Sequence, residues 1–249
     1  MKKIILDDRK QYLPNLIMVL MSLVFLEIVI VIGFLSKNTS LVSTLLGICA
    51  ITMLINTAIM ISMAGKVWLK DLRNTGIWKV RQNEGMTVRK TAYCKEILYA
   101  AMLFLSVMLY GLVLVLDIIW RRNALPLADD DQTEKEFAVF TDNFFHPSLK
   151  NFVLILEFLM VAVAAVALVF VCVTLVYNGL TRNRYAGILA GVLYVSVGYF
   201  LIRLSLTIIH GVKGEIRQSL AGSAIMLIVS GICLEIVTQS VKKHQCAEE

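Results

Sequence analysis

Residues that break helices are scarce in this sequence. It has three prolines, at positions 14, 126 and 147, and all of them lie at or beyond the ends of long apolar stretches. Proline inside a helix removes a backbone hydrogen bond and clashes with the preceding turn, so we expect these stretches to form unbroken helices. Unbroken helices argue against the class of secondary transporter that binds its substrate at discontinuous helices.

Motifs that carry chemistry in soluble enzymes are missing as well. The sequence contains no G-x-x-x-x-G-K-[ST] P-loop for ATP hydrolysis and no H-E-x-x-H zinc-protease motif. None of its three histidines lies inside an apolar stretch, and its five cysteines include no C-x-x-C pair. We therefore expect no enzyme activity, no metal or other cofactor and no structural disulfide in this chain.

Apolar residues, in contrast, are abundant, since they make up 58% of the 249 residues and give a mean hydropathy of +0.77. They form six stretches, each long enough for a membrane-spanning helix, which needs about 20 mostly apolar residues. The hydrocarbon interior leaves no water for unpaired amides, so each stretch must be helical. We predict an all-α polytopic membrane protein with one transmembrane domain over 1–249. Its six transmembrane helices lie at about 15–35, 41–64, 97–119, 152–177, 186–209 and 219–238.

The net charge of +6 reflects how Lys and Arg are distributed along the chain. Most of the 24 basic residues lie in four segments that fall on one side of the membrane, and short loops rich in Lys and Arg are typically cytoplasmic. We therefore place both termini and segment 65–96 in the cytoplasm, and segment 120–150 outside. The charge then indicates membrane topology and no nucleic-acid partner, and we expect a multi-pass protein of the cell membrane.

Two segments outside the spans have helical patterns. Residues 1–14 place apolar side chains near one helical face and end at Pro14, which predicts a short interfacial helix, with a plain charged tail as the alternative. In the extracellular segment, Phe137, Phe140 and Phe144 form an apolar helical stripe. The stripe predicts either a helix on the outer lipid headgroups or a lid over a substrate exit.

Ionisable residues inside the predicted spans are costly and therefore mark candidate functional sites. These residues are Glu27, Asp117, Glu157, Arg203 and Glu235. Glu157 and Arg203 lie at similar depth in the outer half, and we predict that they pair, because an unpaired charge there is strongly unfavourable. Glu27 and Asp117 lie in the same half and compete for Arg203. The group forms either the polar lining or gate of a transport route, or a structural ion pair between helices.

Small residues in the fifth span indicate a close helix contact. Gly187 and Gly191 form a G-x-x-x-G motif, and Gly198 continues near the same face. Such a face lets another helix approach closely. It predicts either helix packing within one chain or the seam of a dimer.

Segment 65–96 is long for a connection between two spans and is the most basic part of the chain. Gly76 and Gly85 interrupt it, so we predict two short cytoplasmic helices around a turn. After Gly85, the residues Met-Thr-Val-Arg-Lys-Thr-Ala-Tyr-Cys-Lys lead directly into the third span.

This run, with its Arg-Lys pair and the Lys just before the span, resembles the element before the third span of type-2 ABC exporter permeases, including bacteriocin-immunity and peptide-export permeases. The six-span plan, the cytoplasmic termini and the chain length agree with that family. The resemblance implies that the segment is a coupling element, which docks in a groove of a separate ABC ATPase subunit that binds ATP and Mg. The residues implied to make this contact are Thr87, Arg89, Lys90 and Tyr93.

The same resemblance implies a complex of two permease chains, identical or different, with two ATPase chains. It implies an amphipathic peptide or a hydrophobic toxin as the exported cargo. Two other functions stay open from the residues alone. One is a non-transporting immunity or scaffold protein that binds a partner in the membrane, and the other is an ATP-independent secondary carrier.

Overall fold

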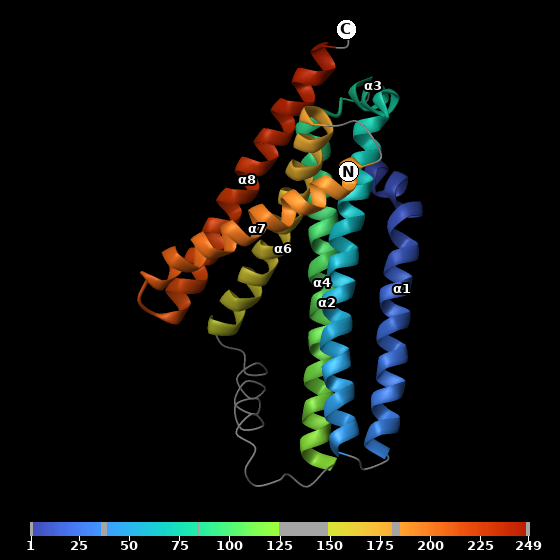
Figure 1. The fold of residues 1–249 in the computed structure, drawn as a ribbon, viewed down its shortest axis with the longest axis vertical. Coiled ribbons are helices and arrows are strands. Elements are labelled where there is room, and N and C mark those ends of the chain that lie inside the picture. Colours follow the sequence, from blue (N-terminus) through green and yellow to red (C-terminus); the bar gives the residue numbers. More distant parts are fainter. Residues whose placement is uncertain (1, 36–38, 84, 125–148, 181–184, 248–249) are drawn as a thin grey trace. The chain divides into compact units, whose positions relative to one another are not determined.

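The computed structural model describes residues 2–35, 39–83, 85–124, 149–180 and 185–247. Within these ranges the chain is helical and contains no strand (Figure 1). The helices, six long and one short, are α1 Lys2–Leu35, α2 Thr39–Arg73, α3 Thr75–Asn83, α4 Val88–Ala124, α6 Leu149–Gly179, α7 Ala186–His210 and α8 Glu215–Ala247. The all-α fold that the sequence predicted is confirmed.

The long helices are also those of a polytopic membrane protein. In the described residues, α2, α4, α6, α7 and α8 each contain a stretch long and apolar enough to cross a membrane. The apolar part of α1, Leu16–Ile32, is shorter. Each of the six predicted spans lies on one of the six long helices.

Several helices extend further than the apolar stretches predicted. On the side predicted to be cytoplasmic, α2 continues to Arg73, α4 begins already at Val88, and α8 runs to Ala247. Hydropathy marks only the part of a helix that contacts lipid, whereas Lys, Arg, Glu and Gln are good helix formers that prolong it into the polar region. Much of segment 65–96 is therefore a continuation of the spans.

The N-terminal segment differs from the predicted short interfacial helix. α1 runs from Lys2 to Leu35 with Pro14 inside it, so the first residues are the initial turns of the long helix. A proline interrupts only the hydrogen bond of its own turn, and the helix continues on both sides of it. The prediction of a separate helix that ends at Pro14 was wrong.

The chain divides into two compact units, which are described separately. The first comprises 1–12, 59–104 and 153–249, and the second comprises 13–58 and 105–152. Several helices contribute to both units, and a single transmembrane domain over the whole chain stays a prediction.

The second unit has a polar cluster within its apolar core. The hydroxyl of Tyr110, on α4, accepts a hydrogen bond from Asn56 Nδ2 at 2.5 Å and lies 2.6 Å from Ser22 Oγ. It also lies 3.3 Å from the carbonyl oxygen of Val19, which accepts a bond from it. Hydrogen bonds between side chains of different helices stabilise membrane bundles, so this cluster ties α1, α2 and α4 together.

In the first unit, α6 supplies much of the apolar core. Its buried residues form an almost continuous run from Ala162 to Val176. A methyl group at Gly65 of α2 would meet Val169 Cγ1 of α6 at 3.0 Å, so the two helices approach closely where glycine leaves room. One turn further along α2, the ring of Trp68 stacks on Phe170, with ring centroids 4.8 Å apart. These contacts fix the end of α2 from which the connection to α4 begins.

Candidate functional site: the braced connection between α2 and α4

The connection between α2 and α4 contains the short helix α3, which ends in a defined turn. Gly85 adopts a φ of 72°, and the backbone N–H of Met86 donates to the carbonyl oxygen of Arg81 at 2.9 Å. A residue in the left-handed conformation, followed by a backbone bond that reaches back five residues, is the Schellman motif that ends many helices. Glycine adopts the left-handed conformation without steric cost. The turn directs the chain from α3 into α4.

Thr87 begins α4. The backbone N–H of Lys90 donates to Thr87 Oγ1 at 3.2 Å, and the backbone N–H of Thr91 donates to the Thr87 carbonyl at 3.0 Å. A threonine in this position satisfies backbone donors that the first helical turn leaves unpaired. The hydroxyl that the sequence assigned to a docking contact is therefore used in capping the helix.

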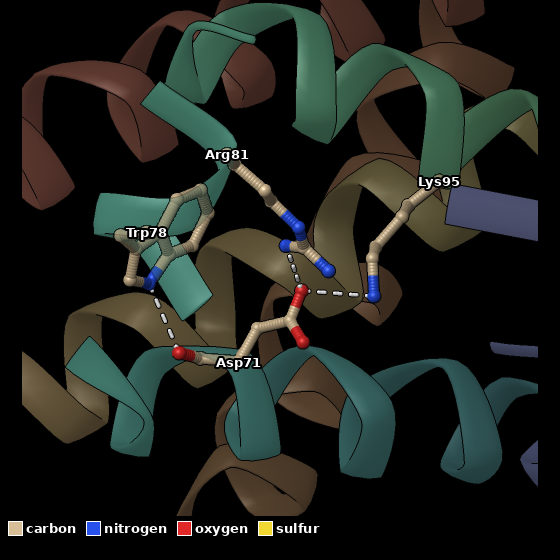
Figure 2. A network of polar contacts seen from close by, with 4 residues as sticks. All are labelled: Asp71, Trp78, Arg81 and Lys95. Carbon is tan, nitrogen blue, oxygen red and sulfur yellow. Dashed lines mark hydrogen bonds and ion pairs between the residues drawn. The ribbon is translucent and has the colours of Figure 1, made fainter. Parts of the chain in front are cut away.

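The centre of the connection is a buried cluster of charges, shown in Figure 2. The carboxylate oxygen Oδ2 of Asp71 accepts a bond from Arg81 Nη1 at 2.6 Å and from Lys95 Nζ at 2.8 Å. All three residues are buried, and Lys95 has 0% of its surface exposed. One acid on α2 thus holds a cation from α3 and another from α4. Because buried charges are tolerated only when they are paired, the cluster fixes the three helices relative to one another.

Aromatic side chains surround this cluster. The indole N–H of Trp78 donates to the Asp71 carbonyl oxygen at 2.9 Å, and the guanidinium of Arg81 lies over the Trp78 ring, 5.5 Å from its centre. Trp78 meets Trp68 edge to face at a centroid distance of 5.9 Å. The indole N–H of Trp68 donates to Thr174 Oγ1 of α6 at 2.8 Å. Both indoles are buried with their N–H groups satisfied, so α3 is packed firmly against α2, and α2 against α6.

A second buried acid joins the start of α4 to α8. Ser230 Oγ donates to Glu96 Oε1 at 2.5 Å, and both side chains are buried. Glu96 directly follows Lys95, so consecutive residues of α4 bind different helices. Asn178 of α6 in turn donates to Ser240 Oγ of α8 at 3.0 Å. The start of α4 is therefore anchored on two sides.

The four predicted docking residues lie on the outside of this braced core. All four side chains are exposed. We call this set of residues the elbow surface: Thr87, Arg89, Lys90 and Tyr93. The guanidinium of Arg89 lies 5.7 Å from the centre of the Tyr93 ring, an arrangement that favours a cation over an aromatic face. The predicted second short helix is absent as a separate element, because these residues belong to the continuous helix α4.

The sequence did not identify the residues that brace the elbow surface. Asp71, Trp78, Arg81 and Glu96 had no predicted role, and Lys95 was noted only for its likeness to a family pattern. The sequence did contain a signal for a buried ion cluster, because Asp71 and several Lys and Arg residues lie between the second and third apolar stretches. Spacing alone does not show which of the cations the acid binds.

The predicted ion pair between Glu157 and Arg203 is not formed among the described residues. Arg203 is exposed on α7, where its Nε donates to Tyr199 Oη at 3.2 Å. Glu157 instead lies close to Gly222 of α8. Its Oε1 is so near that a methyl group added at Gly222 would meet it at 2.7 Å. Residues four apart face the same side of a helix, and Arg203 therefore finds a partner on its own helix.

The other predicted residues have different outcomes. Glu27 lies partly covered on α1, and Glu235 is exposed on α8, where Gln239 Nε2 donates to it at 3.1 Å. Asp117 lies in α4, and its side chain falls outside the described part of the structure. The stripe of Phe137, Phe140 and Phe144 also lies outside the described residues.

The glycines of α7 have little contact within the chain. A methyl group at Gly187 or Gly191 would meet nothing within 4 Å among the other described residues, and one at Gly198 would meet Leu168 Cδ2 at an ordinary 3.8 Å. Two of the three glycines therefore leave an open face on α7.

Comparisons with known proteins add no relative, since no family model, no curated protein and no solved structure matches this chain. In the described residues, no group of three His, Cys, Asp or Glu side chains is placed to hold a metal ion. The functional interpretation therefore depends on the arrangement of the elbow surface and the charged core beneath it.

Proposed function

We propose that this chain is the membrane subunit of an ATP-driven exporter, of the type-2 ABC exporter permease class. In this proposal the ATPase is a separate cytoplasmic subunit, which binds ATP and Mg and docks on the elbow surface. The chain itself hydrolyses no ATP. It acts in a bacterial plasma membrane and exports an amphipathic peptide or a hydrophobic toxin.

One observation supports the proposal most strongly, namely that an exposed basic and aromatic surface lies on a rigidly held base. Arg89 and Lys90 are exposed, whereas Lys95, two turns along the same helix, is buried and bound to Asp71. A basic loop that served only to set membrane topology would need neither a buried ion cluster nor packed indoles. A surface that transmits force needs such a base, because a mobile loop would absorb the movement of its partner.

The continuity of α4 offers a route for that movement. α4 extends from Val88 to Ala124, so the elbow surface and the third span are one helix of 37 residues. Glu96 also links the same turns to α8 through Ser230. In the proposed mechanism, closure of the ATPases displaces the start of α4, and the displacement passes to the spans without an intervening loop.

A second permease chain is part of the proposal. The open glycine face of α7, at Gly187 and Gly191, favours contact with a helix of another chain, because small residues let two backbones approach. The second chain is either a copy of this one or a related permease.

The test is purification of the tagged chain from its native host in mild detergent. We expect a P-loop ATPase without membrane spans to purify with the wild-type chain. The double charge reversal R89E/K90E removes the proposed attraction and should reduce the recovered ATPase by about tenfold or more, a loss of about 1.4 kcal/mol in binding. The matched control K242E/K243E reverses two exposed charges at the end of α8 and should leave recovery unchanged.

Other results would point to the other two functions. If the purified chain alone moves substrate down a gradient in liposomes, it is a secondary carrier. If it binds a membrane partner and neither an ATPase nor transport is found, it is an immunity or scaffold protein. Equal ATPase recovery with R89E/K90E and with the wild type would remove the assignment of the elbow surface.

A further inference from the structure

Glu27 is an acid within the apolar part of α1. It lies inside the apolar stretch Leu16–Ile32, within the first predicted span. With a rise of about 1.5 Å per residue, it is about 12 Å from the end of α1 at Leu35. At that depth neither bulk water nor lipid headgroups reach the carboxylate readily, so its surroundings within the protein decide its state.

Those surroundings supply no partner. Glu27 Oε2 is buried and has no hydrogen-bond partner among the described residues. The side chain lies at the border between two faces of α1. One face carries the buried residues Leu26 and Ile30, and the other carries the exposed apolar residues Leu20 and Val24, which lie seven and three positions before Glu27. One oxygen is thus covered by the protein, while the rest of the side chain is still accessible from outside.

The nearest described polar cluster does not need Glu27. Asn56 Nδ2 donates to the hydroxyls of Ser22 and Tyr110, and each hydroxyl donates to the carbonyl oxygen of Val19. That cluster is complete without a carboxylate. A charged acid beside it, with one oxygen that no described residue binds, is a cost to the fold unless a ligand neutralises its charge.

We infer that Glu27 binds the cationic group of the transported molecule. The ligand class is an amphipathic cation, whose ammonium or guanidinium group reaches the accessible side of the carboxylate while its apolar part lies along Leu20 and Val24. A charge-assisted hydrogen bond from such a group to the accessible part of the carboxylate neutralises the charge of Glu27. The inference rests on the proposed function, which identifies the ligand as the exported cargo. It adds that this cargo must carry a positive charge.

The experiment uses the purified full chain in nanodiscs of zwitterionic lipid, without ATPase or nucleotide. The probe is a fluorescent amphipathic peptide of Lys and Leu, compared with the same peptide after acetylation of its lysines. We expect the wild type to bind the cationic probe more tightly than the acetylated one. Glu27→Gln keeps the size of the side chain and mimics a protonated carboxyl, and it should weaken binding of the cationic probe by at least about tenfold. Binding of the acetylated probe should stay the same.

Two further variants make the result specific. Glu27→Asp retains the charge and should retain a measurable preference for the cationic probe. Glu157→Gln removes another acid of the spans and should leave binding unchanged. Equal binding of the cationic probe by the wild type and Glu27→Gln would overturn the inference, because the carboxyl would then be needed only in its neutral form. A marked loss of thermal stability in Glu27→Gln would also overturn it, since the carboxylate would then have a structural role.

Failure of this inference differs from failure of the proposed function. The binding measurement contains no ATPase, so it reports only on the site at Glu27. Recovery of the ATPase with the wild-type chain tests the exporter proposal independently of any cargo.

Discussion

At the scale of single residues, Asp71 is the side chain on which the candidate site most depends. Its Oδ2 binds both Arg81 and Lys95, and its backbone carbonyl accepts the indole N–H of Trp78. Replacing Asp71 by a neutral residue removes the acid that both buried cations share. Replacing either Arg81 or Lys95 leaves Asp71 paired with the other cation.

We predict that Asp71→Asn lowers the free energy of unfolding by about 3–5 kcal/mol, the cost of breaking a buried ion pair by removing one partner. Thermal or denaturant unfolding of the purified chain in detergent measures the effect. Lys70→Gln, which changes the exposed neighbouring residue, is the control and should have little effect. An unfolding midpoint for Asp71→Asn equal to that of Lys70→Gln would show that the cluster does not hold the elbow surface in place.

The residues of the site were predictable only in part. The exposure of Arg89 and Lys90 agrees with their prediction as docking residues, because charged side chains are seldom buried without partners. Lys95 carries the same charge and is nevertheless fully buried, since the fold places Asp71 of another helix beside it. Partners from different helices cannot be assigned from their positions in the sequence. The predicted pair of Glu157 with Arg203 also joins two helices, and in the described residues Arg203 bonds to Tyr199 of its own helix instead.

At the scale of secondary-structure elements, the turn at Gly85 determines how α4 leaves α3. Its φ of 72° lies in the left-handed region, where side chains with a Cβ are strained. The bond from Met86 N–H to the Arg81 carbonyl depends on this conformation. At this turn the elbow surface is positioned by backbone geometry.

We predict that Gly85→Ala destabilises the chain by about 1–2 kcal/mol, the cost of the left-handed conformation for a residue with a Cβ. Gly85→Asn should cost less, because asparagine tolerates this conformation better. Gly111→Ala is the matched control in the interior of α4, where a methyl group would meet nothing within 4 Å. Unfolding in detergent compares the three variants. A cost for Gly111→Ala as large as that for Gly85→Ala would show that the backbone conformation is not the cause.

Elements were predicted well where hydropathy determines them and poorly where it does not. All six apolar stretches lie on long helices, and a short helix, α3, begins one residue before Gly76. The continuation of α2 to Arg73 and the early start of α4 at Val88 were missed, because polar helical turns have no hydropathy signal. The passage of α1 through Pro14 was missed because a proline usually marks a helix end.

At the scale of the whole molecule, the topology is a prediction from the distribution of Lys and Arg. Lys213 lies in the turn between α7 and α8, predicted to be outside, and Lys242 lies near the end of α8, predicted to be in the cytoplasm. Both are exposed, so both suit chemical labelling.

We predict that a cysteine at position 213 reacts with a membrane-impermeant maleimide in intact cells, whereas a cysteine at position 242 reacts only after the membrane is opened. The experiment uses a chain whose native cysteines have been replaced by serine. The positive-inside distribution of basic residues is the physical reason. Labelling of position 242 in intact cells would invert the topology and place the elbow surface outside, away from any cytoplasmic ATPase.

The most direct measurement of the central claim is site-specific photo-crosslinking from the elbow surface in the native host. A photoreactive amino acid replaces Lys90, and a second variant carries it at Lys213 as a control. The account predicts that position 90 crosslinks to a P-loop ATPase, identified by mass spectrometry, and that position 213 does not. A Lys90 variant that is expressed and folded but yields no ATPase adduct would contradict the account.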